Sequence, residues 1–310
     1  MYRQVYGHSF PDLYDVAREC PLAMLNSNEM FEFPRPLMAK FVYIGGLGMG
    51  IGNETRSPLN LDFKKLVDES KSIVVFTFGS IAPAYKMPDD WKEAFWGAFK
   101  DLSEHTFIMR YEKPEELVGK LPSNVHAFKW IPQTDLLLQP KTKLLITHGG
   151  YNSLQEAIST AVPVVAIPLF GDQPKNGKII ESRHFGVTLQ KSEIQRDKIR
   201  EAIKTVVEDE SYKKSITRVR QMIKKRPVSA EDLLIRWTEF VGEFKTLENL
   251  KPKAQDLSLI VYHSIDVMAF LLFVAFTVLY IIYLIFKFII RLFMAFLRKI
   301  GLISQKQKTE

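Results

Sequence analysis

The chain has 310 residues, of which 46% are hydrophobic and 25% are charged, so its composition is that of a globular protein and excludes wholesale disorder. Its single cysteine, Cys20, excludes an intrachain disulfide and a cysteine-rich zinc module. The formal net charge is +7, but from Lys287 onward six basic side chains stand against one acidic side chain, so most of the excess lies in a short C-terminal segment. A nucleic-acid-binding protein spreads its basic excess over a folded face, and we therefore expect no nucleic-acid partner.

The first 60 residues show little regular patterning. We interpret residues 1–44 as the remnant of a preceding domain and predict a strand over the apolar stretch 41–44. The glycine run that follows has no complete Gly-x-Gly-x-x-Gly register, and the polar residues after it do not indicate a helix, which argues against a dinucleotide-binding loop. Residues 45–60 are therefore predicted to be a linker, and Asn53 within it begins an Asn-Glu-Thr sequon for N-glycosylation.

From residue 61 to residue 255, strand-like and helix-like segments alternate. Short apolar, β-branched runs predict strands, and longer segments of helical periodicity predict helices. This order is typical of an α/β fold, with a Rossmann-like parallel sheet and helices on both faces, in which ligands bind beyond the carboxyl ends of the strands. The predicted strands are residues 73–78, 107–109, 125–128, 144–147, 163–167 and 186–189, and the predicted helices are residues 91–102, 152–160 and 176–184 and a helical region over 196–244.

The C-terminal region carries one long apolar segment. Residues 267–286 contain no charged side chain and would form a helix about 30 Å long, which matches the hydrocarbon thickness of a bilayer. We predict a transmembrane helix over 264–287, and the alternative is a buried core helix, which is usually shorter and has a polar stripe. Because the basic residues follow the span, the tail 288–310 is predicted to be cytosolic and the large N-terminal part lumenal or extracellular.

Both ends of the chain carry information on targeting. Lys306 and Lys308 have a spacing that looks like a dilysine retrieval signal of the endoplasmic reticulum, and the alternative is a solvated basic tail. Residues 1–10 lack the apolar core of a signal peptide, so we expect either insertion by the tail alone or a longer natural N-terminus. Together these features predict a single-pass protein of the endoplasmic reticulum membrane with a lumenal soluble domain.

Polar loops follow four of the predicted strands, so all of them are expected at one edge of the sheet. In the loop that begins at His148, two glycines let a ligand approach the backbone, and the helix predicted from Asn152 offers unpaired N–H groups that suit a diphosphate. Trp130 lies at a strand end, where an indole can stack on a planar base. Asp172 and Gln173 pair a carboxylate with an amide, which suits adjacent sugar hydroxyls. The four loops are residues 79–80, 130–133, 148–153 and 172–173.

Each of these residues also has a purely structural interpretation. Ser153 and Glu156 have the spacing of a capping box, in which the serine caps the helix and the glutamate reaches back. An isolated tryptophan such as Trp130 often packs in a core, and a strand-end histidine such as His148 is often an ordinary hydrogen-bonded polar group. Asp172 could form an Asx turn or cap the following helix. Taken singly, the residues leave these alternatives open.

Taken together, the motifs resemble those of a known family. The Trp-Ile-Pro-Gln run at Trp130, the His-Gly-Gly-Tyr-Asn-Ser run with Glu156, and the Pro-Leu-Phe-Gly-Asp-Gln run ending at Gln173 resemble the donor-binding signature of family 1 glycosyltransferases. With the Thr-Phe-Gly-Ser run ending at Ser80, the apolar span and the lysine tail, they resemble the animal UDP-glucuronosyltransferases. The resemblance implies the C-terminal domain of a GT-B glycosyltransferase followed by one membrane anchor.

This resemblance also implies a role for each part of the chain and each matched residue. Residues 1–44 would be the remnant of the N-terminal acceptor domain, and residues 61–255 the UDP-sugar donor-binding domain. The expected ligands of the uracil and ribose are Trp130, Gln133 and Glu156, those of the diphosphate are Ser80, His148, Gly150, Asn152 and Ser153, and those of the transferred sugar are Asp172 and Gln173.

The implied activity is transfer of glucuronate or glucose from a UDP-sugar to a small lipophilic acceptor. We expect neither a cofactor nor a metal, and the six histidines show no metal-ligand spacing. In this family the general base belongs to the acceptor domain, and His8 does not match its motif, so no catalytic residue is assigned. The alternative is a catalytically incomplete donor-binding or interaction subunit, which would pair with the same or related transferases in the membrane.

Overall fold

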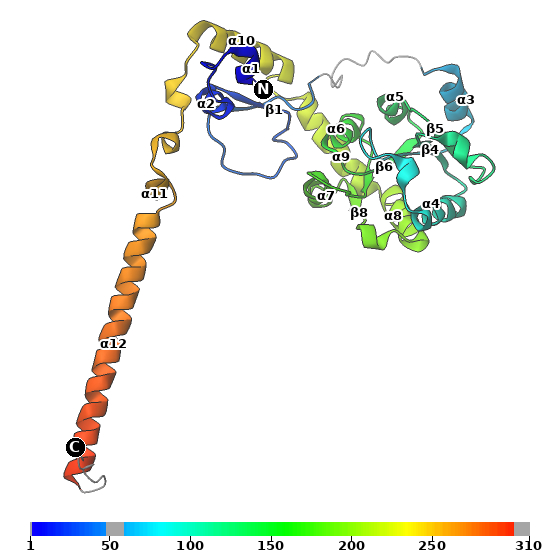
Figure 1. The fold of residues 1–310 in the computed structure, drawn as a ribbon. Helices are drawn as coiled ribbons and strands as arrows, with labels where there is room; N and C mark the ends of the chain where they lie inside the picture. Colours follow the sequence, from blue (N-terminus) through cyan, green and yellow to red (C-terminus); the bar gives the residue numbers. More distant parts are fainter. Residues whose placement is uncertain (1, 48–58, 301–310) are drawn as a thin grey trace. The chain divides into compact units, whose positions relative to one another are not determined.

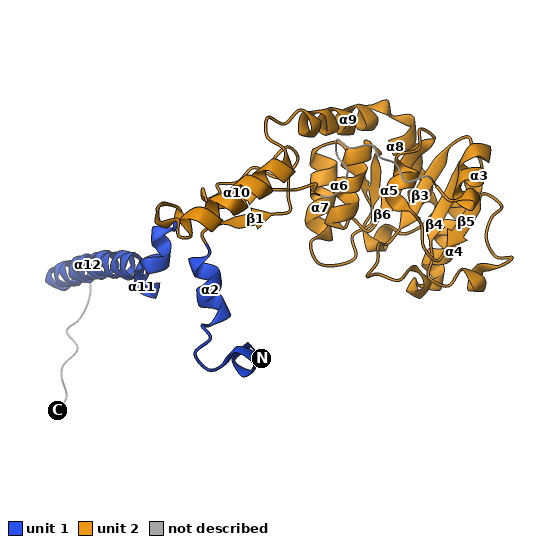
Figure 2. Ribbon diagram, turned by 90° about the horizontal axis from the view of Figure 1, so that it is seen from above, with its two compact units in different colours: residues 1–20, 251–310 blue, residues 21–250 orange. Residues whose placement is uncertain are grey.

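The computed structural model describes residues 2–47 and 59–300 of the chain. The chain forms two compact units, one made of residues 21–250 and the other of residues 1–20 together with 251–310 (Figure 2). Residues 21–44, which the sequence assigns to a preceding domain, thus belong to the same unit as the sheet. The predicted domain boundaries at residues 44, 60 and 255 stay predictions.

A six-stranded parallel sheet forms the centre of the larger unit (Figure 1). Its strand order is β5-β4-β3-β6-β7-β8, and every pair of neighbouring strands is parallel. All five residues of β3 are buried, as expected where helices cover both faces of a sheet. The predicted α/β fold is therefore confirmed. The strands are β3 (Ile73–Thr77), β4 (Thr106–Arg110), β5 (Val125–Phe128), β6 (Thr142–Thr147), β7 (Val164–Ala166) and β8 (Gly186–Thr188).

Alternating side chains of β3 point into two separate apolar cores, one on each face of the sheet. Val74 and Phe76 pack with α4 and α8, whereas Ile73 and Val75 pack with α3, α5, α6 and α7. Figure 1 shows α4 and α3 on opposite sides of the strands. The helices of this unit are α3 (Leu61–Glu69), α4 (Asp89–Asp101), α5 (Gln133–Leu137), α6 (Tyr151–Thr160), α7 (Gln173–Ser182), α8 (Arg196–Glu208), α9 (Glu210–Lys224) and α10 (Ala230–Phe244), with 3-10 turns at Ala84–Lys86, Pro114–Leu117, Lys191–Glu193 and Glu248–Leu250.

Some helix boundaries differ from the prediction for identifiable reasons. The polar segment after the glycine run does open a helix, because the Asn60 side chain accepts a hydrogen bond from the Phe63 N–H and caps α3. Helix α7 begins earlier than expected, at Gln173, since the next residue is a proline, which fits the first turn. The helical region over 196–244 is three helices, because Asp209 ends α8 and caps α9, and Ser229 caps α10.

A short parallel pair of strands precedes the linker. Strand β2 (Phe41–Tyr43) was expected, whereas β1 (Ala23–Leu25) was not, because three residues of mixed character carry no periodic signal. Phe31, which lies between these strands in the sequence, is 1% exposed and belongs to the apolar core beside α6 and α7. Asn53 lies outside the described residues, so the sequon has no structural description.

The smaller unit contains one long helix, α12 (Ile265–Lys299), of 35 residues. It is long and apolar enough to cross a membrane, and none of its most apolar window is buried against the protein. The predicted span lies inside it except for Ser264, which precedes its first residue, and the helix continues through the basic residues Arg291, Arg298 and Lys299 of the predicted tail. The unit also contains α1 (Tyr2–Tyr6), α2 (Leu13–Glu19), α11 (Leu259–Tyr262) and a 3-10 turn at Lys253–Asp256. Lys306 and Lys308 lie outside the described residues.

Candidate functional site

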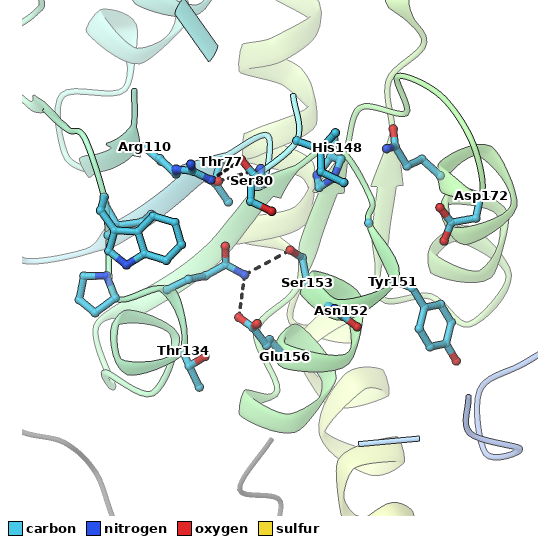
Figure 3. A pocket seen from close by; sticks show the side chains of 18 of the residues that line it. Thr77, Ser80, Arg110, Thr134, His148, Tyr151, Asn152, Ser153, Glu156 and Asp172 are labelled. Atoms are coloured by element: carbon cyan, nitrogen blue, oxygen red, sulfur yellow. Dashed lines mark hydrogen bonds between the residues drawn. The ribbon is translucent and has the colours of Figure 1, made fainter. Parts of the chain in front are cut away.

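A cavity of about 620 Å³ opens at the carboxyl edge of the sheet (Figure 3). Its walls are the residues that follow β3, β5, β6 and β7 and the first residues of α5, α6 and α7, as the parallel topology requires. All of the predicted donor-binding residues line it: Ser80, Trp130, Gln133, His148, Gly150, Asn152, Ser153, Glu156, Asp172 and Gln173. The structure therefore brings the whole predicted set together.

The His148 ring lies against two glycines. A Cβ atom at Gly79 would approach the imidazole to 2.5 Å, and one at Gly150 would approach it to 2.8 Å. Gly79 and Gly149 also have φ values of +72° and +80°, a region that favours glycine. Gly79 is therefore needed both for its backbone conformation and for the space that the ring occupies, whereas Gly149 is needed for its conformation and Gly150 for the space.

Burial sets the charge of His148. His148 is only 9% exposed, and its Nδ1 lies 3.3 Å from the Thr147 hydroxyl oxygen. This burial lowers the pKa of the imidazole below its ordinary value of 6.5, and the Asp172 carboxylate opposes the shift. His148 is therefore a neutral hydrogen-bonding group near neutral pH.

At one end of the cavity, the side chains of Gln133, Ser153 and Glu156 are joined by hydrogen bonds (Figure 3). The Gln133 amide donates to the Glu156 carboxylate at 2.7 Å and to the Ser153 hydroxyl at 3.3 Å. Gly150 precedes α6, so Ser153 lies in the first turn of the helix, and the capping-box interpretation is wrong. Burial raises the pKa of Glu156, against the effect of hydrogen bonds from Gln133 and Thr134.

Trp130 faces the same end of the cavity and is 66% exposed, so the alternative of core packing is wrong. The Arg110 guanidinium lies over the indole, 4.7 Å from the ring centroid, and donates a hydrogen bond to the Gly79 carbonyl. Arg110 also lies 3.8 Å from Glu112. Its Nε is buried and has no hydrogen-bond partner among the described residues.

Arg110 was not among the predicted site residues. It is the last residue of β4, and the rule that carboxyl ends of parallel strands converge applies to it as to the others. The apolar pattern predicts a strand over 107–109 alone, which leaves out the polar residue that ends β4.

Asp172 and Gln173 form the other end of the cavity. The Asp172 side chain does not cap α7, contrary to the structural alternative. Instead, it accepts a hydrogen bond at 2.8 Å from Asn176, which also donates to the Gly149 carbonyl at 2.9 Å. The Gln173 side-chain oxygen accepts hydrogen bonds from the N–H groups of Leu169 and Phe170, at 2.7 and 2.9 Å. Asn176, fully buried and absent from the prediction, thus joins Asp172 to the glycine loop.

This arrangement suits a nucleoside diphosphate joined to a sugar. The first residues of α6, Tyr151 to Ser153, line the cavity, and the unpaired N–H groups of a helix N-terminus favour a phosphate anion. An exposed indole offers a stacking surface for a base, while carboxylates at both ends can accept hydrogen bonds from hydroxyls. Within residues 2–47 and 59–300, no group of three or more His, Cys, Asp or Glu could hold a metal ion. Transfer without a metal stays a prediction.

The fold belongs to the class of GT-B glycosyltransferases, as predicted. Among solved structures, the chain is similar to the GT-B glycosyltransferase Os79 from O. sativa in complex with UDP, with 25% identity and a TM-score of 0.51 over 61% of this chain and 44% of that chain. Another Os79 structure, in complex with U2F and trichothecene, matches with a TM-score of 0.56 at 24% identity, over 66% of this chain and 49% of that chain.

Sequence comparison identifies the family. Residues 2–300 match the family described as UDP-glucoronosyl and UDP-glucosyl transferase, and the chain belongs to it. UDP-glucuronosyltransferase 1A3 of Rattus norvegicus is 36% identical over 86% of this chain and 49% of the relative. UDP-glucuronosyltransferase 1A7 of Mus musculus is 38% identical over 84% of this chain and 48% of the relative. The resemblance noted in the sequence is confirmed, and the chain spans about half the length of the curated relatives that it matches.

Proposed function

We propose that this chain is the donor-binding half, with its membrane anchor, of a hexosyltransferase that moves glucuronate or glucose from a UDP-sugar to a small lipophilic acceptor. Family membership supports the reaction class, and the Os79 structures in complex with UDP support a uridine nucleotide as the ligand of this fold. The observation that carries the proposal is the convergence of ten residues from four separate segments on one cavity, whose volume is typical of small-molecule sites.

The donor would extend from one end of the cavity to the other. The uracil stacks on Trp130, which Arg110 contacts, and Glu156 accepts hydrogen bonds from the ribose hydroxyls. Asp172 and Gln173 hold the hydroxyls of the hexose. Between them, the remaining lining residues donate to the diphosphate; these are Ser80, His148, Gly150, Asn152 and Ser153, with Gln133 beside the nucleoside.

In the reaction, an acceptor oxygen forms a bond to the anomeric carbon while the bond from that carbon to the diphosphate oxygen breaks. The acceptor proton passes to a base, for which we assign no residue of this chain, and UDP leaves with the bonding electrons. Negative charge therefore grows on the diphosphate, where the N–H groups of the first turn of α6 and the His148 ring stabilise it. The proposed transfer uses no metal.

The long apolar helix α12 supports membrane attachment of this enzyme. We propose a single-pass protein of the endoplasmic reticulum with the sheet unit on the lumenal side, because the basic residues follow the span. Lys306 and Lys308 would then act as the cytosolic retrieval signal, and Asn53 would be open to glycosylation. Pairing with a second copy or with a related transferase would occur within the same membrane.

A second candidate is a donor-binding subunit that is catalytically incomplete alone, because none of the residues that line the cavity is assigned as the base. Purified full chain in detergent should bind UDP in titration calorimetry. Incubation with labelled UDP-glucuronate or UDP-glucose and a panel of lipophilic phenols then separates the candidates: transfer supports the complete enzyme, and binding without transfer supports the subunit. If the full chain binds neither UDP nor either UDP-sugar, both candidates are wrong.

A further inference from the structure

A short segment ahead of the linker, residues 27–33, lies against the two helices whose N-termini line the cavity. Phe31 is 1% exposed, and its ring centroid is 5.9 Å from that of Tyr151, the first residue of α6. Arg183, at the end of α7, donates hydrogen bonds to the carbonyls of Phe31 and Glu32 at 2.9 and 2.7 Å. The segment is thus packed on both helices and is not part of a free connector.

The Glu32 carboxylate is the centre of these contacts. Its side chain is 2% exposed and forms an ion pair with Lys175, the third residue of α7, at 2.8 Å. It also accepts a hydrogen bond from the Ser27 hydroxyl at 3.0 Å, and that hydroxyl lies 2.8 Å from the Tyr151 phenol oxygen. One buried carboxylate therefore connects the start of α6 with the start of α7.

Both connected residues adjoin groups that face the cavity. Tyr151 directly precedes Asn152 and Ser153, and Lys175 follows Asp172 and Gln173 within one helical turn. Figure 3 shows the Tyr151 phenol pointing away from Ser153 and Glu156, which is consistent with its bond to Ser27. A shift of either helix would move the N–H groups and side chains that line the cavity.

We propose that Glu32 is a positioning residue that holds the N-termini of α6 and α7 in the arrangement required for the nucleoside diphosphate. This inference rests on the proposed function of the cavity. Glu32 does not itself touch the cavity and acts through Lys175, Ser27 and Tyr151.

The charge of Glu32 fits this role. Burial alone would raise the pKa of the carboxyl, but hydrogen bonds from Lys175, Ser27 and the Phe33 N–H outweigh it and hold the pKa below its usual value. Glu32 is therefore ionised at neutral pH. Replacement by glutamine removes this charge at almost constant volume and weakens the connection to Lys175.

The same segment offers a matched control. Glu29 forms an ion pair with Arg226 at 2.9 Å, and this pair involves neither α6 nor α7. In titration calorimetry of the full chain with UDP, Glu32→Gln should raise the Kd about tenfold, an effect of the size seen for coupled contacting residues, while Glu29→Gln leaves it unchanged. Amide hydrogen exchange should rise at residues 151–153 and at Gln173, Lys175 and Asn176 in Glu32→Gln only.

A second variant tests the connection if Glu32→Gln does not fold. Tyr151→Phe removes only the phenol oxygen and keeps the ring against Phe31, and it should raise the UDP Kd about threefold. Equal UDP affinities for both glutamate variants and the wild type, or equal losses in both, would overturn the positioning role. If the wild type binds no UDP, the proposed function fails. In that case the positioning role is tested by hydrogen exchange alone, and the same amide exchange in the two glutamate variants would overturn it.

Discussion

The two ends of the cavity differ in what holds their residues in place. At the end that contains Arg110 and Glu156, side chains hold one another, through the cation–π contact with Trp130 and the hydrogen bonds of Gln133. At the other end, the buried Asn176 amide holds Asp172 in place. It donates hydrogen bonds to the Asp172 carboxylate and to the Gly149 backbone carbonyl. Figure 3 shows Arg110 and Asp172 at opposite sides of the site. Single substitutions at the first end should therefore change mainly the affinity for the ligand. Substitutions at the second end should change both the affinity and the free energy of unfolding.

The largest expected effect is at Trp130. Because the indole is 66% exposed, Trp130→Ala should leave the fold intact and remove a stacking surface, raising the Kd for UDP about 30-fold. Trp130→Phe should retain most of the affinity. Trp237→Ala, on α10 away from the cavity, is the control and should bind UDP as the wild type does. Unchanged UDP affinity in both Trp130→Ala and His148→Ala would remove the donor-site assignment.

A smaller effect at the same end tests the ribose contact. Glu156→Gln removes the acceptor charge and disturbs the bond from Gln133, and it should weaken UDP binding about tenfold, as is usual for a hydrogen bond to a charged group. The loss should vanish with 2′,3′-dideoxy-UDP, which lacks the hydroxyls that the carboxylate accepts from. An equal loss for both nucleotides would mean that Glu156 supports the helix rather than the ribose.

The other end should respond differently. Asn176→Ala leaves the Gly149 carbonyl and the Asp172 carboxylate without their shared donor, so the free energy of unfolding should fall by about 1–3 kcal/mol. The Kd for a UDP-sugar should rise about fivefold, and that for UDP less, since Asp172 is assigned to the hexose. Chemical denaturation and calorimetry with both ligands measure this difference; equal effects on both ligands would contradict the division of the cavity.

Much of the fold was predictable because it depends on local patterns. The alternation of apolar strand segments, such as that of β3, with helical segments predicts a parallel α/β sheet, and the strand-end rule then gathers the lining residues at one edge. The assignment of Trp130 and Glu156 to the site depended on the family resemblance, because each residue taken alone also had a structural interpretation.

The residues that were missed depend on contacts between distant parts of the chain. Asn176 and Glu32 are buried polar residues whose importance comes from partners 27 and 143 positions away. No periodicity or turn rule links such pairs, so their role becomes visible only when the helices are placed against each other. Arg110 is the exception, since its place at a strand end could have been predicted.

The smallest expected effect is a pH dependence of UDP affinity that comes from His148. Burial lowers the pKa of His148, and a bound diphosphate should raise it again, because negative charge favours the imidazolium. Since the bound state then holds its proton more tightly, UDP affinity should increase as pH falls through the pKa of the complex, by about threefold between pH 7.5 and 5.5. In His148→Gln this increase should be lost, whereas Trp130→Phe should retain it. The titration of UDP itself is the same for every variant, so only the difference in pH dependence between variants reports on His148. If His148→Gln showed the same pH dependence as the wild type, the histidine would not contact the diphosphate.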